Sequence, residues 1–151
     1  MRTLTNTLLT AGLATAATTI TAVVLGARRK RPAKIVNSTS HILWGDRDAK
    51  RASEFDLKHT LTGFALNAGA MVAWAGTQQL LFGKPAGRSL TRAAAVGAAT
   101  SALAWLTDYK VVPKRLTPGF EMHLDAREMT VMYGVLAGAL ALGRALRTDE
   151  A

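Results

Sequence analysis

The side chains that could do acid–base or ligand chemistry gather in two parts of this 151-residue sequence. One part, 41–59, contains two of the three histidines, and the other, 108–128, contains the third. Eight of the ten acidic residues fall in the same two parts, and the remaining two are Asp149 and Glu150. The sequence has no cysteine, which excludes disulfides, thiolate metal ligands and a cysteine nucleophile. Any polar site must therefore be built mainly from histidine and carboxylate groups.

The spacing of three residues predicts a shared helix face. His59, Gly63 and Asn67 recur every four residues, which places them one above another on a helix. The next helix should return antiparallel and end at Asp108, so we expect Asp108 to contact His59. Two interpretations stay open, namely a polar contact that pins two helices and a proton or headgroup site. The candidate residues of this polar site are His41, His59, Asn67, Asp108, Tyr109 and His123.

The short motifs that mark common enzymes do not occur in the sequence. It contains no G-x-S-x-G elbow, no H-E-x-x-H pair and no Walker loop. The spacing of the three histidines does not favour a metal site either. We therefore expect no catalytic residue, no metal and no cofactor, and a non-enzymatic role is favoured.

Long stretches without charge dominate the rest of the chain. Residues 3–27 and 60–83 carry no charged side chain, and each exceeds the roughly 20 residues that a helix needs to cross a bilayer. Two shorter stretches reach that length if the flanking Arg92 and Arg144 extend to the headgroups. The sequence thus predicts an all-α fold, an integral membrane bundle forming one membrane domain, 1–151. Its four transmembrane helices are expected at about 5–27, 57–82, 90–110 and 126–146.

A soluble, alanine-rich four-helix bundle is the alternative. Mean hydropathy is only +0.14, and threonine is frequent in the first stretch. A soluble helix needs a polar face, however, and 60–83 has no charged residue to provide one. Cations follow the first stretch at 28–31, whereas they precede the apolar part of an export signal. We therefore expect the first helix to be retained in the membrane.

The distribution of lysine and arginine predicts an orientation. Thirteen of the nineteen Lys and Arg residues lie in or beside two predicted loops, 28–58 and 111–125. The positive-inside rule places both loops in the cytoplasm and both termini on the opposite side. Because the cations follow the loops in this way, we expect no nucleic-acid partner.

Two groups of cations on the predicted cytoplasmic face are candidates for binding lipid headgroups. They are Arg28, Arg29, Lys30 and Arg31, and Lys114 and Arg115. An amphipathic segment near 33–44 follows the first group, because apolar residues recur there seven positions apart. This segment is expected either to lie on an anionic membrane surface or to cap the helix bundle. The predicted partners are therefore the bilayer and its anionic phospholipid headgroups.

Local signals predict how the helices begin and pack. Gly134 and Gly138 form a G-x-x-x-G pair, which allows two helices to approach closely and indicates a homo-oligomer as one outcome. Capping-box spacing at 53–56 and 125–128 predicts two helix starts, and Ser89 can cap a third.

Three segments carry a resemblance to a known group of proteins. They are His41–Gly45, with the sequence HILWG, the tripeptide Lys58–Thr60, and the stretch Asp108–Glu121 with its two prolines. Across most of its length the chain resembles small multi-pass inner-membrane proteins of bacteria for which no activity is known. The resemblance implies a bacterial inner membrane and assigns no catalytic residue. In such a membrane, the orientation predicted from the lysines and arginines makes both termini periplasmic.

The sequence therefore favours a small multi-pass membrane protein whose basic cytoplasmic face contacts anionic lipid or a partner protein. The alternative is a membrane enzyme or transporter-like protein with a polar site at the cytoplasmic mouth.

Overall fold

A computed structural model describes residues 1–83 and 89–147. Regular structure in these ranges is entirely helical, which confirms the all-α class. The α-helices are α1 (Arg2–Ala27), α2 (Lys34–Ser38), α3 (His41–Trp44), α4 (Asp46–Arg51), α5 (His59–Phe82), α6 (Leu90–Leu106) and α7 (Ala126–Ala145). A π-helix, η1 (Thr107–Val111), and two 3₁₀ turns, η2 (Lys114–Leu116) and η3 (Phe120–Met122), lie between α6 and α7.

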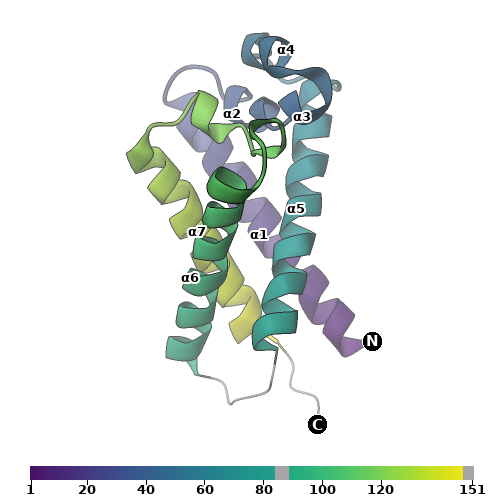
Figure 1. The fold of residues 1–151 in the computed structure, drawn as a ribbon, viewed down its shortest axis with the longest axis vertical. Helices are drawn as coiled ribbons and strands as arrows, with labels where there is room; N and C mark the ends of the chain where they lie inside the picture. Colours follow the sequence, from purple (N-terminus) through teal and green to yellow (C-terminus); the bar gives the residue numbers. More distant parts are fainter. Residues whose placement is uncertain (84–88, 148–151) are drawn as a thin grey trace.

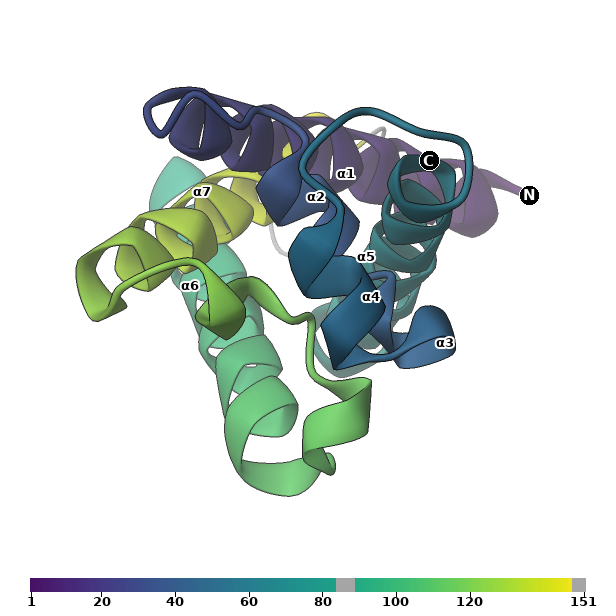
Figure 2. The ribbon, with the colours of Figure 1, turned by 90° about the horizontal axis from the view of Figure 1, so that it is seen from above.

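Four long helices, α1, α5, α6 and α7, run along the longest axis of the molecule (Figure 1). The short helices α2 to α4 and the turns before α7 form one end, which we call the loop end. Seen from that end, α6 packs on α7, α7 on α1 and α1 on α5, whereas α5 and α6 meet over a smaller area (Figure 2). The start of α1 and the ends of α5 and α7 lie at the opposite end.

Membrane-spanning capacity differs among the long helices. Within the described ranges one helix, α1, is long and apolar enough to cross a bilayer, judged by length and composition. Helix α6 has only 17 residues, fewer than the predicted span over 90–110, because the last turn continues as a π-helix. The existence of an apolar first helix is confirmed, and the four-span arrangement remains a prediction.

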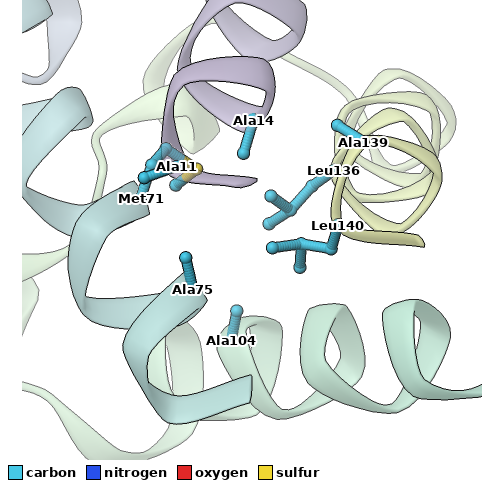
Figure 3. Packing of buried hydrophobic residues seen from close by; sticks show 8 residues of the cluster. All are labelled: Ala11, Ala14, Met71, Ala75, Ala104, Leu136, Ala139 and Leu140. Atoms are coloured by element: carbon cyan, nitrogen blue, oxygen red, sulfur yellow. The ribbon is translucent and has the colours of Figure 1, made fainter. Parts of the chain in front are cut away.

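Small side chains fill the centre of the bundle. Alanines from α1, α5, α6 and α7 meet there together with a few larger residues (Figure 3). Gly97 shows how close the helices approach, because a Cβ atom there would lie 2.4 Å from the carbonyl oxygen of Ala137 on α7. The buried threonines of α1 satisfy their hydroxyl groups within the helix, as when Thr15 donates to the carbonyl of Ala11 at 2.8 Å. Small residues thus allow close packing, as in membrane bundles.

Large apolar side chains, in contrast, cover much of the outside. On α5, Leu80 is 87% exposed, whereas Gln78, two residues earlier, is completely buried. The amide Nε2 of Gln78 donates to the carbonyl of Leu140, and its Oε1 accepts from Arg147 at 3.1 Å. Other exposed apolar residues on the long helices include Leu4, Leu8, Ile20, Val24, Leu61, Phe64, Val72, Leu103, Leu106, Val131 and Leu142. The long helices thus carry an extensive apolar outer surface, and some of their buried positions are polar.

Two of the three predicted helix caps are confirmed. Asp125 and Glu128 form a reciprocal capping box at α7, and Ser89 accepts from the backbone N–H of Arg92 at 3.3 Å. The predicted box over 53–56 is wrong, because α5 begins later. Asp56 is the capping residue there, since its Oδ1 accepts from the backbone N–H of His59 at 2.5 Å.

Candidate functional site

The segment 33–44 forms a buried plug at the loop end. It consists of two short helices, α2 and α3, and its apolar residues Ile35 and Val36 are buried in a cluster with α1 and α7. Gly63 on α5 makes room for it, because a Cβ atom there would lie 2.1 Å from the carbonyl oxygen of Val36. The lipid-surface interpretation of this segment is therefore wrong for Ile35 and Val36. It caps the bundle instead, and only Leu43 and Trp44 among its large apolar residues are exposed.

Asn37 explains why the plug is fixed in place. Its side chain is completely buried, and its Nδ2 donates to the carbonyl oxygens of Ala52 at 3.2 Å and Glu54 at 2.8 Å. Its Oδ1 accepts from the hydroxyl of Thr60 at 2.7 Å. These bonds satisfy the buried amide and tie α2 to the segment before α5.

His41 is almost fully buried between two acceptors. Its Nδ1 lies 2.8 Å from Oδ1 of Asp46, and its Nε2 lies 2.9 Å from the carbonyl oxygen of Thr117. A carbonyl oxygen only accepts, so Nε2 is the donor in the bond to Thr117. Gly119 permits this arrangement, because it has φ +80° and a Cβ atom there would lie 2.9 Å from the His41 ring.

His59 belongs to a different group of charges from the one predicted. Its Nδ1 lies 3.1 Å from Asp56, and its Nε2 lies 3.5 Å from Asp48, which also pairs with Lys58. The Lys58 ammonium holds the pKa of Asp48 below its usual range, and the backbone N–H of His59 does the same for the pKa of Asp56. Asp108 has no part in this cluster. The predicted pairing of His59 with Asp108 is therefore wrong.

Asp108 instead lies on a cavity between α5 and α7 at the loop end. The π-helical turn η1 carries it, and its Oδ2 accepts from the hydroxyl of Tyr133 on α7 at 2.6 Å. Tyr109, the next residue, packs edge-on against Tyr133 with ring centroids 6.1 Å apart. Its hydroxyl is buried without a hydrogen-bond partner. A π-helical turn of this kind is frequent at functional sites, so the position of Asp108 is notable.

The cavity beside Asp108 has a volume of about 110 Å³ and a mostly apolar lining. Asn67 lies on its wall, and its Nδ2 donates to the hydroxyl of Thr18 on α1 at 3.0 Å. Asn67 therefore faces a neighbouring helix, as its depth in an apolar helix indicates. Trp74 and Leu136 contribute apolar surface.

A second cavity, of about 220 Å³, lies where α1 meets α2 and is lined by cations. We call it the basic pocket, and its lining consists of Gly26, Arg29, Arg31, Lys34, Ile35 and His123. Burial lowers the pKa of His123 to about 4, and nearby Lys34 adds to the shift. Nε2 of His123 is buried without a hydrogen-bond partner. Burial also lowers the pKa of the Lys34 ammonium.

The predicted headgroup residues divide between this pocket and other surfaces. Arg31 lies on the pocket, whereas Arg29 lines it but also donates to both carboxylate oxygens of Glu128 at 2.6 and 2.7 Å. Arg28 and Lys30 are exposed beside it, and Lys30 adopts φ +58° in the turn after α1. Lys114 and Arg115 are exposed on η2 and do not line the pocket.

The six predicted polar residues therefore do not form one site. They fall into four places: His41 with Asp46, His59 with Asp48 and Asp56, His123 in the basic pocket, and Asn67, Asp108 and Tyr109 near the cavity. Within the part of the chain that the structure describes, no three His, Asp or Glu residues lie close enough together to hold a metal ion.

Sequence reasoning missed Tyr133 as a site residue. Tyr133 lies within an apolar stretch, and nothing in its spacing links it to Asp108, which is 25 positions away. Lys34 belongs to the basic loop predicted over 28–58, but its place beside His123 depends on how α2 folds back on α1. Gly134 and Gly138 face outward with nothing within 4 Å of a Cβ atom, so oligomer formation through them stays a prediction.

No protein-family model, curated protein or solved structure matches this chain.

Proposed function

We propose that this chain is a small multi-pass protein of the bacterial inner membrane, with four spanning helices and a basic cytoplasmic face that binds anionic phospholipid. The basic loops 28–58 and 111–125 face the cytoplasm, and both termini face the periplasm. The role is non-enzymatic, and the phosphate of the lipid headgroup occupies the basic pocket.

The observation that carries the membrane assignment is the apolar outer surface of the long helices. Large apolar side chains lie outside on charge-free lengths of α1 and α5, and alanine, glycine and threonine lie inside. In water such an outer surface would favour aggregation, whereas a bilayer solvates it. Close packing of small residues is the usual way in which helices associate in lipid.

The basic pocket supports the choice of an anionic headgroup. Arg31 and Lys34 place two cations on one cavity of about 220 Å³, next to the end of the apolar helix α1. Repulsion from Arg31 contributes to the lowered pKa of Lys34, so a bound anion would relieve an unfavourable local field. A phosphate could also accept from Nε2 of His123, which has no partner. The depth of the site matches the headgroup layer if α1 spans the membrane.

Lipid binding by the purified full chain tests the headgroup assignment. The protein in a non-ionic detergent is titrated with phosphatidylglycerol, with phosphatidylcholine and, in a separate arm, with inorganic phosphate, and bound lipid is counted by native mass spectrometry. We expect phosphatidylglycerol to bind in preference to phosphatidylcholine. Binding of phosphatidylglycerol without competition from inorganic phosphate would indicate that the acyl chains also contribute.

Two double variants that remove the same charge distinguish binding in the basic pocket from a general attraction between the basic face and anionic lipid. Arg31→Gln with Lys34→Gln should weaken phosphatidylglycerol binding roughly thirtyfold, since each of the two juxtamembrane cations contributes about 1 kcal/mol. Lys114→Gln with Arg115→Gln removes the same charge from η2 and should have a much smaller effect. Equal losses in the two variants, or no preference for the anionic lipid, would contradict the assignment of the basic pocket.

A further inference from the structure

The cavity beside Asp108, between α5 and α7, differs in charge from the rest of the loop end. The chain has 19 Lys and Arg residues against 10 Asp and Glu, yet the residues that line this cavity include one carboxylate, Asp108, and no cation. Within the described ranges, Asp108 has no ion-pair partner. This half-buried carboxylate beside a mostly apolar cavity therefore lacks the counter-charge that usually accompanies such a group.

Two of the polar residues that line the cavity have acceptor atoms left over from their own hydrogen bonds. Tyr133 donates its hydroxyl proton to Oδ2 of Asp108, which leaves Oδ1 of Asp108 to accept another bond. Asn67 donates through Nδ2 to Thr18, which leaves its Oδ1. Thr18 donates its own proton to the carbonyl of Ala14 at 2.8 Å. A ligand that satisfies these atoms must supply donors or positive charge, and an anion would meet only repulsion.

The remaining lining is suited to the apolar part of such a ligand. Leu66, Met71 and Leu136 supply aliphatic and thioether surface from α5 and α7. Trp74 supplies an aromatic face, to which organic cations are attracted. A volume of about 110 Å³ admits one small organic molecule.

We infer that this cavity binds a small lipophilic organic cation, a substituted ammonium whose charge lies at Asp108 and whose apolar group packs against Trp74. The site is separate from the basic pocket, since no residue lines both cavities. It therefore does not depend on the lipid-binding proposal, and failure of one leaves the other intact.

Calorimetric titration of the full chain in a non-ionic detergent tests the inference. The probe is N,N-dimethylbenzylammonium, and the control is isobutylbenzene, a neutral molecule of the same shape. We expect saturable binding of one cation per chain and at least tenfold weaker binding of the neutral molecule, the difference produced by about one charged hydrogen bond. Equal binding of the two molecules would overturn the inference.

Three variants locate the binding site. Asp108→Asn should weaken cation binding at least about tenfold, while Glu54→Gln, which removes an exposed carboxylate at the same end, should leave it unchanged. Ala70→Trp keeps Asp108 but adds a large side chain at an exposed position on the cavity lining, and it should also abolish binding. Ala70→Trp decides the question if Asp108→Asn fails to fold. Unchanged binding in both Asp108→Asn and Ala70→Trp would overturn the inference.

Discussion

The Nε2 atom of His41 lies 2.9 Å from the carbonyl oxygen of Thr117, a residue 76 positions later in the chain. This bond joins α3 to the loop that precedes α7. Leu116 and Pro118, which flank Thr117, line the cavity that contains Asp108. His41 therefore holds part of the cavity wall in place, although neither His41 nor Thr117 lines the cavity.

Replacement of His41 tests this tie. His41→Leu removes the donor to Thr117 and the partner of Asp46, and it leaves a buried carbonyl without a hydrogen bond. We expect the free energy of unfolding to fall by about 2–3 kcal/mol, measured by circular dichroism during denaturation in detergent. Asp46→Asn is the milder comparison, because the Asp46 side chain is largely exposed. Equal losses in the two variants would show that the Thr117 bond contributes little.

Two glycines on α5 offer a matched pair. A Cβ atom on Gly63 would lie 2.1 Å from the carbonyl oxygen of Val36, whereas a Cβ atom on Gly69 would meet nothing within 4 Å. Gly63→Ala should therefore displace the α2 plug and lower the free energy of unfolding by about 1–3 kcal/mol. Gly69→Ala should raise it by up to about 1 kcal/mol through helix propensity. The same denaturation assay measures both, and similar effects of the two substitutions would contradict the close approach of α2.

The lowered pKa of His123 predicts a dependence of stability on pH. Its pKa is about 4 in the folded chain, below the ordinary value of 6.5. As pH falls, His123 is therefore protonated in the unfolded chain before it is protonated in the folded chain. Its contribution to the free energy of unfolding is lost between about pH 6.5 and 4 and does not change further below that range. The slope of the free energy of unfolding against pH corresponds to uptake of up to one proton on unfolding. His123→Gln should remove this component between pH 7 and 4, and an unchanged slope would show that other groups produce it.

The orientation prediction is tested with reporters on the intact chain. A C-terminal fusion after Ala151 should be active with a reporter that works only in the periplasm, because the positive-inside rule places the basic loops in the cytoplasm. A reporter that works only in the cytoplasm should be inactive there. Resistance of the chain to carbonate extraction from membranes should accompany this result, whereas release by carbonate would rule out the four-span bundle.

The sequence alone located the four long helices, two of them to within two residues at each end. The predicted segments 57–82 and 126–146 correspond to α5 at His59–Phe82 and α7 at Ala126–Ala145. Charge-free stretches and capping residues are local signals, since they act through the backbone of the same few residues. The cap at Asp125 and the polar contact of Asn67 with another helix follow from such signals. The ends of helices were less certain, and η1 replaces the last turn expected over 90–110.

Only the tertiary structure decided which polar groups meet. Spacing fixes how far along a helix His59 and Asp108 lie, but it does not fix the rotation of each helix about its axis or which neighbours pack closest. Because α6 packs mainly on α7, Asp108 meets Tyr133, and His59 meets the acidic residues of the loop end. The burial of 33–44 likewise depends on Gly63, whose missing side chain matters only once α2 has folded back against α5.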